Sequence, residues 1–503
     1  MKKSVKRTLA LLLAALLAVT AISCAKEETP SADIGNSTPA ITDATADPDG
    51  LADSDGPADS DGPAEKPGGT DPGVASEEAV EPTEPEWPEP DYSDFVMPEE
   101  TGELTVYGFD MINLLLSPAL ELFQEKYPDV KVNFVKMTDD EFEARVETEV
   151  PAGKGPDLLF CYAGTLPDPY KTMAAGLFED LTPYLLNDPD FSFDDFLTGV
   201  MDFGKYRGQR QLIPVEVLLP LFKTSVENLA DSGIDPDGIR TLEDFCAACM
   251  RYHENNPENA LFSDGGDEDY LSDLIKISGM SFIDYDRQTP VVDEEMLHTL
   301  LDVCRAFDSE NGRPVGIDYK QISGVIERMY LGSNLSNSSP MILINDMWIV
   351  SHAGETPCIL PAKDISGGTT ADVVSYAAIP IASRNKLNAY RLLDILLSED
   401  IQSGYTKTGW KAAYIRIGSP VRKSSFADHL YFTRDEMFPG DPDIDGYIQV
   451  ILNFRDSVTS ACILPSIIRR YLNLEMMPYV RGEKPWDDCY KRFLSTLELY
   501  ASE

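Results

Sequence analysis

The sequence predicts an α/β protein of two lobes behind an exported, disordered leader. Three observations predict this: an N-terminus that is basic and then apolar, a long acidic stretch rich in proline, and about 400 further residues in which strand and helix patterns alternate. A chain of that length is longer than one hydrophobic core usually supports, so we expect two lobes.

The N-terminus has the pattern of a bacterial lipoprotein signal. Basic residues within Lys2–Arg7 precede a charge-free stretch that ends in Ala21-Ile22-Ser23-Cys24. A basic start, an apolar middle and small residues before a cysteine are typical of such signals. We therefore predict that residues 1–23 are removed and that Cys24 carries acyl chains. An ordinary secretory signal or an uncleaved anchor remains an alternative.

Residues 24–101 are predicted to be a disordered tether. Residues 25–100 contain 22 acidic residues, two lysines and 12 prolines, and a hexapeptide repeats at Asp53–Ala58 and Asp59–Ala64. A segment with this charge and so few apolar residues cannot bury enough surface to offset the entropy of ordering. The anchor and tether predict a domain held at the outer face of the cytoplasmic membrane, in a bacterium of the Gram-positive type.

Composition and motifs argue against several classes of protein. The formal net charge of −45 disfavours binding to nucleic acid. The sequence contains only four histidines and no G-x-S-x-G, H-E-x-x-H, P-loop or G-x-G-x-x-G motif, so we expect neither an enzyme nor a cofactor. Cys246 and Cys249 form a C-x-x-C on a helix that Thr241 is predicted to cap. We interpret these thiols as packing residues, with redox or metal chemistry as the alternative.

The start of the domain predicts a βαβαβ unit. Strand patterns at 103–108, 130–135 and 158–162 alternate with amphipathic helix patterns at 114–126 and 139–149. This order predicts a mainly parallel sheet with helices on its faces. Ligands of such sheets bind beyond the carboxyl ends of the strands, which directs attention to the residues after each strand.

Several segments resemble family 1 extracellular solute-binding proteins, the receptors of bacterial ABC importers. The matching segments, in order along the chain, are Phe123–Pro128, Ala152–Asp157, Ala175–Tyr184, Tyr206–Pro214, Leu221–Lys223, Thr241–Phe245, Met341–Trp348, Ala378–Pro380 and Asn388–Glu399. The resemblance covers most of residues 102–425, and the order of the segments is more specific than any one of them.

The resemblance implies a two-lobed periplasmic-binding-protein-like fold of type II with a hinge. One lobe would comprise about 102–213 and 374–425, and the other about 214–373 and 426–503. It further implies a monomer that captures a small solute, expected to be a mono- or oligosaccharide, and delivers it to ABC permease subunits. A surface sensor or scaffold without a transporter, or a receptor for a peptide or polyamine, remains an alternative.

Aromatic rings and acids near expected strand ends are the candidate ligand contacts. Sugar recognition uses aromatic faces against C–H patches and carboxylates or amides for hydroxyl groups. We expect Trp348 to follow a buried strand and to stack on the solute, with Trp410 as a second platform. The further candidates are Tyr107, Phe109, Tyr162, Glu216 and Asp346. For each of these residues, packing or capping is the alternative.

One loop resembles part of a calcium site. Asp441, Asp443 and Asp445 precede Gly446 at the spacing of an EF-hand-like loop, but Leu452 stands where the bidentate glutamate belongs. We therefore expect no metal, with this loop as a weak candidate.

Overall fold

Residues 84–503 form one compact unit. The computed structural model describes residues 87, 90–109, 115–257, 267–307, 340–352, 354–404 and 418–503. Cys24, most of the predicted tether and Trp410 therefore lie outside the described residues. No helix in the described ranges is long and apolar enough to cross a membrane.

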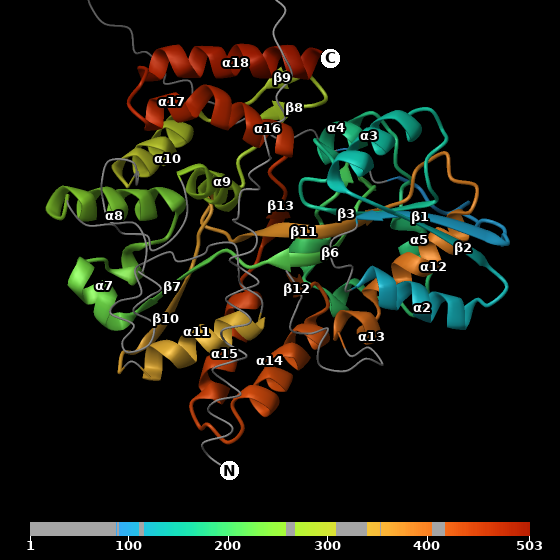
Figure 1. Ribbon diagram of the computed structural model, residues 1–503, viewed down its shortest axis with the longest axis horizontal. Helices are drawn as coiled ribbons and strands as arrows, with labels where there is room; N and C mark the ends of the chain where they lie inside the picture. Colours follow the sequence, from blue (N-terminus) through green and yellow to red (C-terminus); the bar gives the residue numbers. More distant parts are fainter. Residues whose placement is uncertain are drawn as a thin grey trace, which may run out of the picture. The chain divides into compact units, whose positions relative to one another are not determined.

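A seven-stranded sheet occupies the centre of the described part of the chain (Figure 1). Its strand order is β12-β6-β11-β3-β1-β2, and β13 pairs with β11 off this path. The strands are β1 (Glu103–Phe109), β2 (Lys131–Met137), β3 (Leu158–Tyr162), β6 (Ile213–Leu218), β11 (Thr370–Ala378), β12 (Ser419–Pro420) and β13 (Ser460–Cys462). Three two-stranded sheets pair β4 (Lys205–Tyr206) with β5 (Gln209–Arg210), β7 (Leu221–Ser225) with β10 (Pro357–Pro361), and β8 (Ile283–Asp284) with β9 (Thr289–Pro290).

Helices cover this sheet and build the rest of the unit. They are α2 (Leu116–Lys126), α3 (Asp139–Glu149), α4 (Pro169–Ala174), α5 (Thr182–Leu186), α6 (Thr198–Met201), α7 (Val226–Ser232), α8 (Leu242–Asn255), α9 (Asp267–Ser278), α10 (Glu294–Ala306), α11 (Pro340–His352), α12 (Lys386–Leu397), α13 (Glu399–Gln402), α14 (Lys423–Met437), α15 (Ile444–Arg455), α16 (Ser466–Tyr471), α17 (Met477–Val480) and α18 (Trp486–Ser502).

The predicted βαβαβ unit is confirmed. Strand β1 pairs in parallel with both β2 and β3, and α2 and α3 connect the three strands in sequence. Thr138 caps α3 in a reciprocal box with Glu141, which fixes where that helix begins. Strand β3 is buried along nearly its whole length, as the apolar run Leu158–Tyr162 predicts for a strand in the interior of a sheet. The predicted mainly parallel sheet is wrong: the sheet is mixed, because β11 pairs antiparallel with both β3 and β6, and β12 pairs antiparallel with β6.

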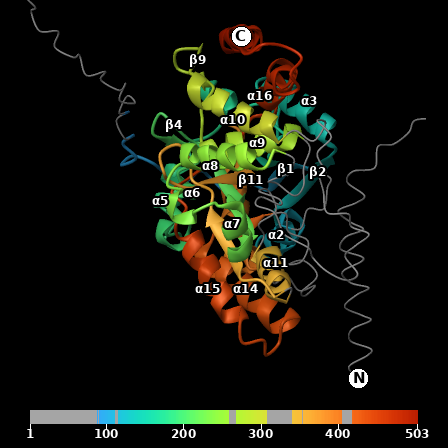
Figure 2. The same ribbon diagram turned by 90° about the vertical axis from the view of Figure 1, so that its left-hand side faces the viewer.

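Three separate hydrophobic clusters form the interior. The first core lies on β1, β2, β3, β6 and β11 with α2–α6 and α12. The second core lies between α8, α9, α10 and α16–α18, and Figure 2 shows α8, α9 and α10 together. The third core joins α11, α14 and α15, at the bottom of Figure 1.

The C-x-x-C cysteines lie inside the second core. Thr241 caps α8 in a reciprocal box with Asp244, which confirms the predicted start of that helix. Cys246 and Cys249 are both buried on its inner face, and burial raises the pKa of the Cys246 thiol to about 12. Both thiols are packed among apolar side chains of the second core, in keeping with their interpretation as packing residues.

The prediction of a strand before Trp348 is wrong. Residues Pro340–His352 form helix α11, and Trp348 lies within it. The buried side chains Leu343, Ile344, Met347 and Val350 recur at helical spacing. Periodicity alone does not separate a buried strand from a buried helix in a short apolar run, and the 13-residue length of the element decides for helix.

Asp394 on α12 makes stability depend on pH. Burial and the nearby charge of Asp188 raise the pKa of Asp394 to about 6. Because the folded protein then holds this proton more tightly than the unfolded chain, Asp394 costs stability progressively as pH rises from about 4 to about 6. Asp394→Asn should therefore raise the free energy of unfolding at pH 7.5 by on the order of 1–2 kcal/mol, with no gain below about pH 4.

Urea unfolding of the purified protein at both pH values measures this effect. Asp400→Asn, a change of the same kind at an exposed position of α13, is the control and should be neutral at both. If Asp394→Asn changed the free energy of unfolding equally at pH 7.5 and pH 4, the raised pKa of Asp394 would be contradicted.

Candidate ligand-binding site

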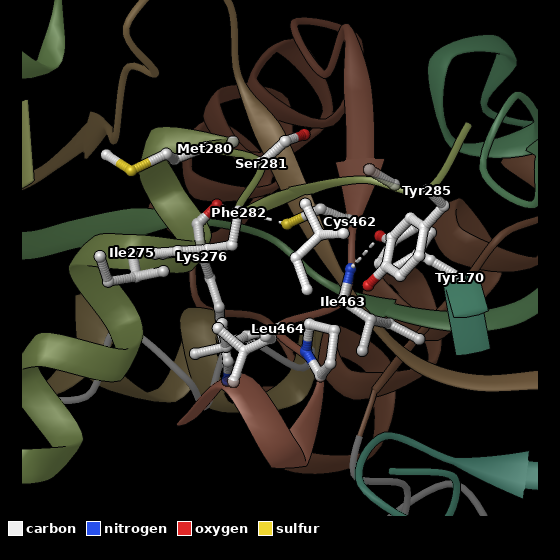
Figure 3. Close-up of a pocket in the computed structure, with 15 residues that line it drawn as sticks. Tyr170, Ile275, Lys276, Met280, Ser281, Phe282, Tyr285, Cys462, Ile463 and Leu464 are labelled. Carbon is white, nitrogen blue, oxygen red and sulfur yellow. Dashed lines mark hydrogen bonds between the residues drawn. The ribbon is translucent and has the colours of Figure 1, made fainter. Parts of the chain in front are cut away.

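A cavity of about 270 Å³ opens where α4, α9, the turn into β8, and the segment from β13 to α16 meet (Figure 3). Its walls therefore come from elements of the first and second cores. The lining residues are Tyr170, Ile275, Lys276, Gly279, Met280, Ser281, Phe282, Ile283, Tyr285, Ala461, Cys462, Ile463, Leu464, Pro465 and Ile468.

Two tyrosines form an aromatic wall of the cavity. The rings of Tyr170 and Tyr285 are stacked, with centroids 6.4 Å apart and planes 25° from parallel. The Tyr170 hydroxyl accepts a hydrogen bond of 3.0 Å from the Ile463 amide, which holds the β13–α16 segment against α4. This wall combines apolar faces with phenolic hydroxyl groups, the combination that suits a ring bearing both C–H and O–H groups.

Lys276 brings a charge to the opposite wall, and that charge is paired. Its Nζ lies 2.8 Å from Asp372 Oδ2 on β11 and 3.8 Å from Asp273 Oδ1 on its own helix. Burial alone would lower the pKa of Lys276, but attraction to Asp372 and Asp273 outweighs burial and raises it. The side chain therefore stays charged and satisfied, and it gives the cavity no unpaired ammonium to attract an anion.

Asp168 lies directly behind the tyrosine wall. It caps α4 by accepting a hydrogen bond of 3.0 Å from the Lys171 amide, and its other oxygen accepts hydrogen bonds from the hydroxyls of Tyr285 and Tyr500. Burial raises the pKa of this carboxyl group, while the hydrogen bonds from Tyr285, Lys171 and Tyr500 oppose the rise.

Burial favours the protonated form of two ionisable groups in the cavity lining. It raises the pKa of the Cys462 thiol to about 12, so the reactive thiolate form is disfavoured. Burial likewise raises the pKa of Tyr170, so its hydroxyl stays protonated. In the described ranges, no three histidine, cysteine or acidic side chains are grouped so that they could hold a metal ion.

The predicted contacts Tyr107, Tyr162 and Glu216 lie elsewhere in the sheet. The Tyr107 hydroxyl donates to Glu149, and Arg145 stacks over its ring. Tyr162 is half-buried at the end of β3, and Glu216 is 2% exposed in β6, where it accepts a 2.9 Å hydrogen bond from Ser375. None of the three lines the cavity, so ligand contact stays a prediction for them.

Trp348 packs in the third core. Its Nε1 donates to Asp441 Oδ2 at 3.1 Å, and its ring contacts Phe438 at a centroid distance of 5.4 Å. The structure describes the backbone of Phe109 and Asp346 but not their side chains. Stacking of Trp348 on a solute stays a prediction, as does any role for Phe109 and Asp346.

Two carboxylates of the candidate calcium loop have side-chain partners. Asp441 accepts from Trp348, and Asp445 pairs with Arg434 at 2.8 Å. The Asp443 amide donates to Asp441, and Asp443 directly precedes helix α15 without a side-chain capping bond. These contacts describe the acidic loop as a turn with one hydrogen bond to Trp348 and one ion pair.

Sequence reasoning missed the residues that line the cavity. The predicted contact Tyr162 ends β3, whereas Asp168 and Tyr170 follow a few residues later. The run Asp168-Pro169-Tyr170 carried a usable signal, because Asp followed by Pro is typical of a helix start just beyond a strand end.

Solved structures identify the fold. A putative oligosaccharide periplasmic-binding protein from Synechococcus sp. MITs9220 superposes with a TM-score of 0.54 at 15% identity, covering 79% of this chain and 99% of that one. An extracellular solute-binding protein of family 1, for which no organism is stated, gives a TM-score of 0.55 at 16% identity, covering 80% and 100%. The fold is therefore the α/β, two-lobed periplasmic-binding-protein-like fold.

Part of the sequence matches a family model. Residues 110–326 match the model of the bacterial extracellular solute-binding proteins, and this match confirms the predicted resemblance to family 1 of those proteins. A comparison with curated proteins found no significant match.

The packing of Trp348 predicts a stability effect. Trp348→Ala should lower the free energy of unfolding by roughly 1–3 kcal/mol, less than for a fully buried ring, because Trp348 is only partly buried against the third core. Urea unfolding measures the change, and Trp87→Ala, at a position that is 45% exposed, is the control. Unchanged stability combined with lost solute binding would support the stacking prediction instead.

Proposed function

We propose that this protein is a lipid-anchored extracellular receptor that captures a carbohydrate between two lobes and delivers it to the permease of an ABC importer. The observation that carries the proposal is the cavity bounded by elements of the first and second cores. The proposed lobes are about 102–213 with 374–425, and about 214–373 with 426–503. Solute would bind without turnover, as a hinge closes the lobes around it.

The paired charges of the cavity favour a neutral solute. Lys276 is neutralised by Asp372 and Asp273, and Asp168 is turned toward two tyrosine hydroxyls. Binding an anion or a polyamine would require breaking one of these pairs. Aromatic and aliphatic walls with nearby hydroxyl groups match a sugar ring instead.

The size of the cavity favours one sugar unit at a time. Sites for small molecules usually measure about 300–1,000 Å³. The cavity, at about 270 Å³, lies just below that range, so it would hold a monosaccharide or one unit of an oligosaccharide. The fold neighbour from Synechococcus is described as a putative oligosaccharide-binding protein, in keeping with the second arrangement.

A thermal-shift screen of sugars, peptides and polyamines on the purified protein tests the proposed solute. We expect a neutral sugar to raise the melting temperature and Ser281→Trp to abolish that rise, because Ser281 is exposed at the cavity wall and an indole there would fill the space. Ser281→Ala is the matched control and should bind as the unaltered protein does. A shift with a peptide or polyamine alone would replace the carbohydrate assignment.

The anchor is tested separately at Cys24. We expect the mature protein to begin at Cys24 and to carry acyl chains, detected by mass spectrometry of membrane-extracted protein. Cys24→Ala should abolish acylation and change the fraction that sediments with membranes. An unmodified N-terminus at another residue would exclude the lipoprotein assignment while leaving the solute-binding proposal intact.

The transporter is tested in the producing cell. Uptake of the identified sugar should be lost on deletion of the receptor and restored by the intact gene. Normal uptake combined with a lost transcriptional response to the sugar would identify a sensor that uses the same fold.

A further inference from the structure

Several of the contacts between the first and second cores beside the cavity meet at one carboxylate, Asp168, apart from the Lys276–Asp372 ion pair. Asp168 stands at the start of α4, which packs in the first core. The two tyrosines that donate to its Oδ2 come from the second core: Tyr285 follows β8, and Tyr500 lies near the end of α18. One oxygen atom therefore joins three elements that lie far apart in the sequence.

The position of Asp168 makes these hydrogen bonds costly to lose. The residue is 4% exposed, and a carboxylate removed from water must be compensated by donors. Separating α4 from β8 and α18 would remove both tyrosine hydroxyls from Asp168 and leave it with main-chain donors of its own helix, Lys171 and Tyr170, until water entered. Hydrogen bonds to a charged acceptor contribute more than neutral ones, so this contact is a strong link for its small area.

A second contact from α4 reinforces the link to α18. Lys171 Nζ lies 3.9 Å from the centroid of the Tyr500 ring and donates to the Tyr500 carbonyl oxygen at 2.9 Å. Tyr500 is thus held through its ring, its hydroxyl and its main chain. The Ile467 amide on α16 also donates to the carbonyl of Pro167, directly before Asp168, at 3.2 Å.

Tyr285 connects this contact to the cavity. Its hydroxyl binds Asp168, while its ring stacks on Tyr170 and forms part of the cavity wall. The orientation of a wall residue is therefore set by a carboxylate that does not itself line the cavity. Figure 3 shows the rings of Tyr285 and Tyr170 side by side.

We propose that Asp168 is a positioning residue which, through Tyr285 and Tyr500, holds the first and second cores together and so controls escape of the solute from the cavity. This proposal rests on the proposed function and specifies how the site closes. The link is made by protein groups alone, so it biases the unit toward the closed arrangement before solute binds. Solute leaves when Asp168 releases the two tyrosines.

Hydrogen exchange of the full protein tests the link without any ligand. The Ile467 amide is the reporter, because its partner is the Pro167 carbonyl on the other side of the link. Tyr285→Phe and Tyr500→Phe each remove one hydroxyl and keep the ring, so the cavity wall and the Lys171 contact remain. Each should speed exchange at Ile467 by about tenfold or more, the factor expected for loss of one hydrogen bond to a charged group.

Tyr390→Phe is the matched control. The Tyr390 hydroxyl donates to Asp188 at 2.7 Å, the same pair of groups, but both lie on first-core elements. Tyr390→Phe should therefore leave exchange at the Ile467 amide unchanged. The amides of α10 report on the second-core interior and should be unaffected by all three variants, which separates local opening from global loss of stability.

Asp168→Asn gives a graded change at the acceptor itself. Asparagine keeps one acceptor oxygen, which can serve the Lys171 amide, and replaces the oxygen that faces the two tyrosines with an NH2 group that can donate to their hydroxyls. The charge is lost but neutral hydrogen bonds can still form, so exchange at Ile467 should rise less than in the double variant Tyr285→Phe/Tyr500→Phe. Unchanged exchange at Ile467 in that double variant would overturn the proposal.

Release kinetics test the consequence for the solute. With the sugar identified in the thermal-shift screen, Tyr285→Phe and Tyr500→Phe should increase the dissociation rate by about the factor seen in exchange, since both depend on the same opening. Faster exchange at Ile467 with an unchanged dissociation rate of the sugar would overturn the proposal that this link controls escape of the solute. If no sugar binds although exchange responds as expected, the proposed function fails and the link between the cores stands.

Discussion

The pairing of strand β11 is the constraint on which the rest of the structure depends. Its nine residues, Thr370–Ala378, pair with β6 along one edge and with β3 and β13 in succession along the other. Nearly every side chain of the strand is buried, so it cannot shift by one residue without turning apolar groups away from the first core. By pairing with β13 at Thr370–Asp372, it also fixes the segment that supplies Ile463 and Leu464 to the cavity.

The parts of the fold that sequence predicts are those set by local patterns. The strands at 103–109 and 158–162 and the cap at Thr241 depend on neighbouring residues and on turn chemistry, and the structure has them where the patterns place them. The apolar run of helix α11 fits the two-residue period of a strand as well as the 3.6-residue period of a helix over a short window, so the sequence predicts a strand there. Its helical state depends on packing against α14 and α15, which no local pattern shows.

The cavity could not be predicted in the same way, because its walls are brought together only by tertiary structure. Tyr170 follows β3, Lys276 stands on α9, Tyr285 follows β8 and Ile463 follows β13. Each residue alone looks like an ordinary core or surface residue. The rule that ligands bind beyond strand ends points to the end of β3 that precedes the cavity wall, but it does not say how many residues past the strand that wall begins.

The two walls of the cavity are tied to different parts of the fold, and this arrangement suits a site that opens and closes. On one side, Lys276 is fixed to β11 through Asp372, at the centre of the sheet. On the other, Tyr285 is fixed to α4 through Asp168. A solute that contacts both walls makes all of its contacts only when the Lys276–Asp372 ion pair and the Tyr285–Asp168 hydrogen bond are both formed. The binding energy of the solute therefore adds to the energy of these two interactions. Tight capture can then be reached with a small cavity, because part of the closing energy comes from contacts within the protein.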